Sequence, residues 1–121
     1  MTVLHNRVSQ VELKKRLYEE TFSRTTFSFY KYFPISDPVA FRDEFYKLGE
    51  SHGLFGRVYV AKEGVNAQLS IPQNNYQIFK QALQGIPVLR GIRLNVSVDN
   101  DGKSFWVLKV KVRDKIVADG I

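Results

Sequence analysis

Residues 25–48, with the sequence TTFSFYKYFPISDPVAFRDEFYKL, contain the pattern that decides the fold. Most of the first nine residues are β-branched or aromatic, as is typical of a β-strand over 25–33. Asp37 and Pro38 then supply a helix cap and a first-turn proline. Apolar residues follow at helical spacing: Phe41, Phe45 and Leu48. This stretch therefore predicts a strand followed by an amphipathic helix over 38–52.

The remainder of the chain continues the alternation of strands and helices. Apolar runs and alternating apolar residues predict further strands at 54–61, 66–71, 92–98 and 104–112, and a second helix at 74–84. The order βαββαβ is that of the split βαβ fold. We therefore predict an α+β, ferredoxin-like (acylphosphatase-like) sandwich. Its helices would cover one face of an antiparallel sheet, with one extra C-terminal strand.

Three further features follow from local patterns. Ser9 and Glu12 form a capping box that predicts a helix over 10–20, so we expect residues 1–24 to be a helical extension and 25–121 to be the ferredoxin-like domain. Between the second and third strands we expect a hairpin, with Gly64 and Asn66 able to adopt positive φ. By period, the predicted core consists of Phe29, Phe41, Phe45, Leu48, Val58, Val60, Leu69, Phe79, Leu83, Leu94 and Val96.

Composition limits the class of protein. The 121 residues are 44% hydrophobic and 25% charged, which suits one globular domain. The chain has no cysteine, which excludes a disulfide framework and a cysteine nucleophile within these residues. No apolar run approaches the roughly 18–20 residues that span a bilayer, so we expect no membrane partner and a cytoplasmic location. A net charge of +6 favours an anionic partner, nucleic acid first.

The last predicted strand carries a row of cations. Lys109, Lys111 and Arg113 alternate with apolar residues, so strand geometry would align them at about 7 Å spacing. Such a row can follow successive phosphates, with Lys31 and Arg57 as extensions of the row. The alternative is a solvated outer face whose lysines discourage edge-to-edge aggregation.

Tyr30 and Tyr32 share the face of the first strand opposite to the core phenylalanines. On a sheet that binds RNA, aromatic side chains in such a place stack on unpaired bases. The alternative is that the N-terminal helix covers this face and that both tyrosines are core residues.

We find no catalytic constellation. His5 and His52 have no acidic neighbours at ligand spacing, so we expect no metal. The segment after the first strand, residues 34–38, has neither the glycines nor the arginine with which acylphosphatases bind phosphate, so acylphosphatase activity is not expected. No P-loop or dinucleotide-binding glycine pattern is present, and we expect no cofactor in this chain.

Four stretches together resemble one protein family: VLHNRVS, RTTFSFYKYFPISDP, FGRVYVAKEGVNAQLS and DGKSFWVLKVKVRDKIVADGI. They are similar to the amino-terminal domain of the rhodanese-containing tRNA uridine hydroxylases. These bacterial enzymes place an oxygen on C5 of the wobble uridine, position 34 of the tRNA, in an oxygen-dependent reaction. The resemblance covers essentially the whole chain, with EGVNAQLS and KVKVRDKIVADG as its most specific parts.

The resemblance implies a two-part enzyme. This domain would precede a rhodanese domain that carries the reactive cysteine, so we expect the chain to be one excised part and to have no turnover alone. Two roles remain open. The domain would bind the anticodon region of tRNA, with cations on the backbone and tyrosines on bases, or it would be a scaffold that packs on the rhodanese domain without RNA contact.

Overall fold

The computed structural model describes residues 10–19, 23–97 and 105–116. The elements in chain order are α1 (Gln10–Tyr18), β1 (Arg24–Tyr32), α2 (Pro38–Ser51), β2 (Phe55–Ala61), β3 (Gly64–Pro72), the 3-10 turn η1 (Gln73–Asn75), α3 (Tyr76–Gln84), the 3-10 turn η2 (Pro87–Leu89), β4 (Asn95–Val96) and β5 (Leu108–Val112). The predicted βαββαβ order and the extra C-terminal strand are therefore confirmed.

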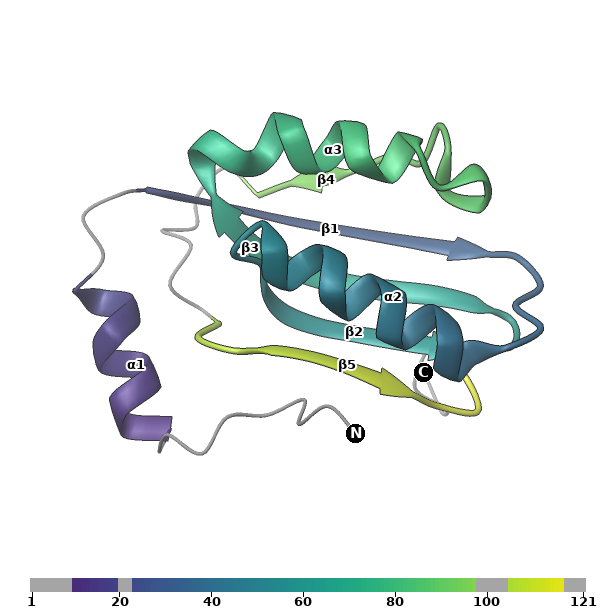
Figure 1. Ribbon diagram of the computed structural model, residues 1–121, viewed down its shortest axis with the longest axis horizontal. Helices are drawn as coiled ribbons and strands as arrows, with labels where there is room; N and C mark the ends of the chain where they lie inside the picture. Colours follow the sequence, from purple (N-terminus) through teal and green to yellow (C-terminus); the bar gives the residue numbers. More distant parts are fainter. Residues whose placement is uncertain (1–9, 20–22, 98–104, 117–121) are drawn as a thin grey trace.

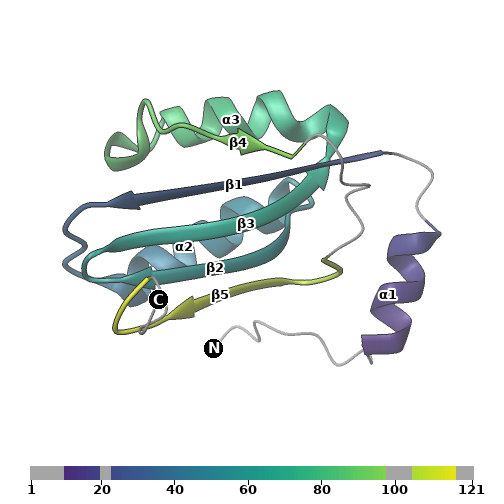
Figure 2. The same cartoon turned by 180° about the vertical axis from the view of Figure 1, so that it is seen from behind.

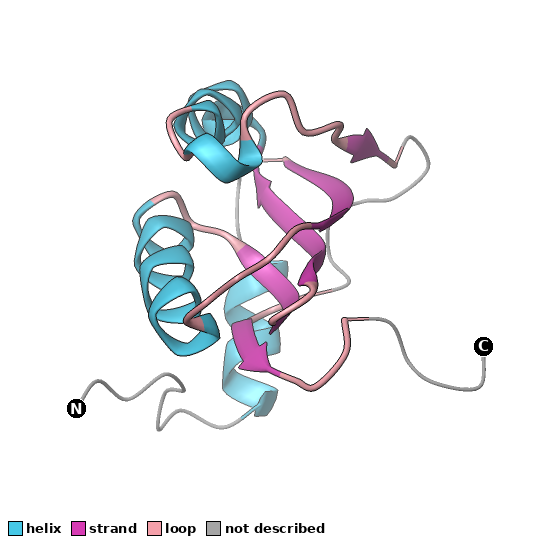
Figure 3. Cartoon of the chain, turned by 90° about the vertical axis from the view of Figure 1, so that its right-hand side faces the viewer, coloured by secondary structure: helices cyan, strands magenta, loops and turns pink. Residues whose placement is uncertain are grey.

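One mixed sheet holds the five strands of the described residues, in the order β4-β1-β3-β2-β5. The first four strands pair antiparallel, but β5 runs parallel to β2, so the expectation of an antiparallel sheet is wrong for this edge. Helices α2 and α3 both cover one face (Figure 1), and an end-on view shows this two-layer arrangement (Figure 3). No described helix covers the other face (Figure 2), which we call the open face.

Helix α1 lies beyond the end of the sheet at which β1 begins, over neither face (Figures 1 and 2). Its Leu17 is buried. The predicted boundary at residue 20 lies outside the described residues.

The core forms between the sheet and the two helices. Phe45 of α2 lies at its centre, with ring centroids 6.2 Å from Phe29 of β1 and 6.2 Å from Phe79 of α3. Most of the predicted core residues are buried, and Phe41, Leu48 and Leu94 are half-buried against them. The prediction that Val96 is a core residue is wrong, because its side chain is 49% exposed.

The exposure of Val96 follows from the fourth strand, which is shorter than predicted. Of the predicted strand 92–98, only Asn95–Val96 pairs with β1, and residue 98 lies outside the described part of the chain. The turn η2 and Gly91, at φ 78°, occupy the preceding residues, so the chain reaches the sheet edge late. Val96 is paired with Phe27 and so faces the helix side at that edge, where about half of its side chain stays exposed.

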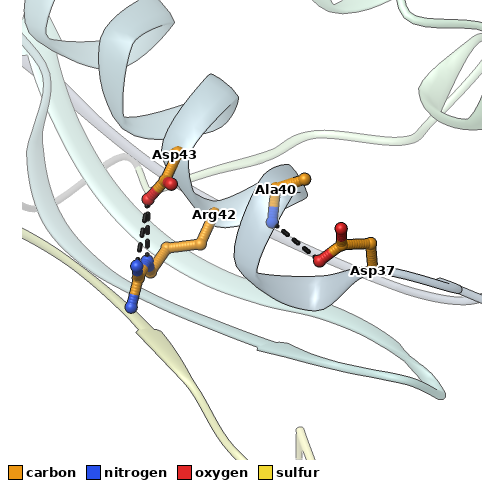
Figure 4. Close-up of polar contacts among 4 residues, drawn as sticks. All are labelled: Asp37, Ala40, Arg42 and Asp43. Carbon is orange, nitrogen blue, oxygen red and sulfur yellow. Dashed lines mark hydrogen bonds and ion pairs between the residues drawn. The ribbon is translucent and has the colours of Figure 1, made fainter.

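Helix α2 begins as its sequence predicts (Figure 4). The Asp37 carboxylate accepts a hydrogen bond from the backbone N–H of Ala40 at 3.1 Å, and Pro38 occupies the first turn. Within the helix, Arg42 pairs with its neighbour Asp43 at 3.0 Å. The cap satisfies one of the backbone donors that a helix start leaves unpaired.

The β2–β3 hairpin turns through two residues, Lys62 and Glu63. Gly64 has φ 152°, and a Cβ there would lie 2.1 Å from the Lys31 carbonyl oxygen, so this close approach requires glycine. Asn66 does not have positive φ, contrary to the expectation, because it is paired within β3 with Tyr59 and Tyr30.

Candidate nucleic-acid interface

The parallel pairing of β2 with β5 brings three predicted cations together on the open face. Arg57 lies opposite Lys109, and Tyr59 lies opposite Lys111. The three cationic side chains are exposed, and Tyr59 is half-buried between them. These four residues line a cavity of about 210 Å³, which we call the cationic pocket.

Arg113 extends the cationic pocket from the end of β5. Its backbone N–H donates to the Val60 carbonyl at 2.8 Å, which continues the strand pairing by one residue. Its guanidinium carbon lies 5.0 Å from the centroid of the Tyr59 ring, a cation–π contact that orients the side chain.

The electrostatics of the cationic pocket suit an anion. Among the described residues, no carboxylate forms an ion pair with Arg57, Lys109 or Lys111. Three unneutralised cations converge on one small hollow, whose positive potential attracts anionic groups. Arginine and lysine side chains donate hydrogen bonds to phosphate oxygens, so a phosphate group suits this donor set.

The two tyrosines lie at the other side of the same face. Tyr30 and Tyr32 are 64% and 57% exposed, so the interpretation that they are core residues under the N-terminal helix is wrong. Their ring centroids are 6.3 Å apart with an interplanar angle of 81°. The pair presents two aromatic faces to solvent, and exposed rings of this kind stack on bases or pack against another protein surface.

Lys31 does not join these residues. Strand alternation turns its side chain to the helix side of the sheet, where its Nζ donates to the carbonyl of Val88 at 2.7 Å. This lysine therefore anchors the turn η2 and lies on the face opposite to the cationic pocket.

Sequence reasoning missed a contact that shapes the open face. The Asn66 amide donates to the Ile116 carbonyl at 3.0 Å, and the Ile116 N–H donates to the Glu63 carboxylate at 3.1 Å. Ile116 is only 2% exposed, and Ala61 on the same face is fully buried. The segment after β5 thus folds back over the hairpin end of the open face. The sequence signals this contact weakly, through the polar residues Glu63 and Asn66 on either side of Gly64 and Val65.

The described residues offer binding groups rather than reactive ones. They contain no group of three His, Asp or Glu side chains that could hold a metal ion. In the same part of the chain, no helix is long and apolar enough to cross a membrane. Cations, phenols and amides on the open face can bind anions, stack on planar groups and form hydrogen bonds.

Comparisons with known proteins agree with this architecture. Residues 24–116 match the family described as UPF0176 acylphosphatase like domain. The chain is 57% identical over 122 residues to a tRNA uridine(34) hydroxylase of Cronobacter sakazakii, and it covers 35% of that protein. It is 58% identical to the protein of the same name from Pectobacterium atrosepticum and 56% identical to that of Escherichia coli K12. The chain thus spans about a third of the length of the curated relatives it matches.

Proposed function

Because this chain belongs to the family of UPF0176 acylphosphatase like domains, we propose that it is the tRNA-binding domain of a tRNA uridine(34) hydroxylase. The enzyme would convert the wobble uridine of tRNA to 5-hydroxyuridine in the cytoplasm. A rhodanese domain in the rest of the protein would supply the reactive cysteine. This domain would hold the anticodon region and needs no cofactor for that task.

One observation carries the proposal: the cationic pocket and the exposed tyrosine pair share the open face. Phosphate contacts provide most of the affinity for a nucleic acid, and stacking on aromatic rings adds about 1–3 kcal/mol per base. An anticodon loop offers both unpaired bases and a phosphate backbone. A scaffold surface would need neither a group of unpaired cations nor two solvent-facing phenols.

The test is a titration of the chain with tRNA at about 50 and 200 mM salt. Three contacts to a single-stranded backbone give a slope of log K against log salt of about −2, at ~0.7 per contact. The triple variant Lys109→Gln, Lys111→Gln, Arg113→Gln should bind more weakly and with a flatter slope.

A matched control removes the same charge from elsewhere. Lys47, Lys80 and Arg93 are exposed, the first two on the helices that cover the other face. Changing all three to Gln should weaken tRNA binding less than the triple variant of β5 does. If both triples weaken binding equally, net charge rather than the open face holds the RNA. If neither changes binding, the β5 cations do not hold the RNA, and if the unmodified chain does not bind tRNA at all, the scaffold role is favoured.

A further inference from the structure

Two rows of side chains cross the open face from β5 to β1. Strand pairing gives the first row as Lys111, Tyr59, Asn66 and Tyr30, and the second as Lys109, Arg57, Gln68 and Ser28. Each row spans three strand spacings, or about 14 Å. The rows have cations at the β5 end, and the first row has an exposed tyrosine at the β1 end.

The first row is interrupted at its centre. Asn66 is engaged by the Ile116 carbonyl, and the buried Ile116 lies over this part of the face. A ligand that joins the cationic pocket to Tyr30 therefore cannot run straight along this row.

The opposite side of the second row is also closed. The Arg24 guanidinium lies 3.9 Å from the centroid of the Phe55 ring and donates to the Gly53 and Ser70 carbonyls at 3.1 Å. Phe55 and Ser70 are paired with each other in the next row of the sheet. Arg24 is 7% exposed, so this stack forms a second boundary of the open face.

Gln68 is the exposed residue between these two boundaries. Gln68 is on β3, and it lies between Arg57 of β2 on one side and Ser28 of β1 on the other. Its amide is without a hydrogen-bond partner among the described residues and offers both donors and an acceptor.

We propose that a single-stranded RNA segment crosses the open face over Gln68, from the cationic pocket to the tyrosine pair. The Gln68 amide forms a hydrogen bond to a base edge or a ribose 2′-hydroxyl midway along this path. This inference rests on the proposed function and specifies the form of RNA and its route. A sheet crossing of this length accommodates about two or three bases.

The single-stranded form follows from the chemistry of the path. Tyrosine rings can stack on base faces only when the bases are unstacked and unpaired. A duplex would present phosphates to the cationic pocket but would keep its bases from Tyr30 and Tyr32. Single strands should therefore gain affinity from the whole path, and duplexes from the cations alone.

The experiment measures fluorescence anisotropy with two labelled probes, an oligouridylate of about five nucleotides and a base-paired RNA of similar charge. We expect tighter binding of the oligouridylate. Gln68→Ala should weaken that binding about two- to tenfold, the loss expected for one hydrogen bond, without changing the salt slope. The control is Gln77→Ala on α3, an exposed glutamine on the covered side of the sheet, which should have no effect.

The outcomes separate this inference from the proposed function. If tRNA binds in a manner that depends on the β5 cations, but the paired probe binds as tightly as the oligouridylate, the path is wrong and the function stands. The same holds if Gln68→Ala and Gln77→Ala bind the oligouridylate equally well. If neither tRNA nor the oligouridylate binds, both the function and the path are overturned.

Discussion

At the scale of single residues, Phe45 joins the two layers of the core. Its ring contacts Phe29, Phe41 and Phe79 from both layers and is 2% exposed. Phe45→Ala should lower the free energy of unfolding by about 3–5 kcal/mol, because it leaves a cavity that neighbouring side chains cannot fill. A urea titration measures this change. A loss below about 1 kcal/mol would contradict the central position of the ring.

Residue placement on the sheet faces was largely predictable. Alternation along the first strand separates Phe27 and Phe29 from Tyr30 and Tyr32, and the structure has them on opposite faces. Alternation also puts Lys31 with the phenylalanines, so grouping it with the β5 cations conflicted with the period of its own strand. Exposure of the tyrosines was not predictable, because it depends on where the N-terminal helix packs.

At the scale of elements, the start of α2 depends on its cap. Asp37→Ala removes the acceptor of the Ala40 N–H and should cost about 1 kcal/mol of stability. Asp37→Asn is the matched variant, because asparagine caps helices about as well as aspartate. Thermal unfolding of both variants measures the effect. If both variants lose the same stability, the charge of Asp37 and not its hydrogen bond stabilises the helix start.

The segment after β5 is held by the hairpin through Glu63. Glu63→Ala removes the acceptor of the Ile116 N–H, so this amide should exchange its hydrogen with solvent faster, by about fivefold or more. Hydrogen exchange followed by NMR reports this rate. Lys62→Ala changes the neighbouring exposed residue and should leave the rate unchanged. Identical rates in both variants would show that burial of Ile116, and not this hydrogen bond, protects the amide.

The edges of the sheet were the least predictable elements. Strict alternation in residues 92–98 predicts a long strand. In the structure, the turn η2 and Gly91 precede this segment, and only Asn95–Val96 forms β4. The pairing partner of β5 also has no local signal. Its parallel alignment with β2 depends on the path of the chain between the strands, and it is this alignment that joins Arg57 to Lys109.

At the scale of the whole molecule, the fold has one covered face and one open face. Helices α2 and α3 bury the apolar side, and the cationic pocket, Gln68 and the tyrosine pair lie on the other side. The fold class followed from the order of elements, whereas the pocket required the register of two strands that are distant in sequence. The proposed function therefore depends on the binding of RNA to the open face.

Chemical-shift mapping of the isotope-labelled chain with an anticodon stem-loop tests this claim most directly. We predict that the amide signals of β2 and β5 and the ring signals of Tyr30 and Tyr32 shift on titration, while those of α2 and α3 do not. The free anticodon loop supplies the unpaired bases and phosphates that this face accommodates. Shifts confined to the helix layer, or no shifts at RNA concentrations that saturate a binding assay, would contradict the account.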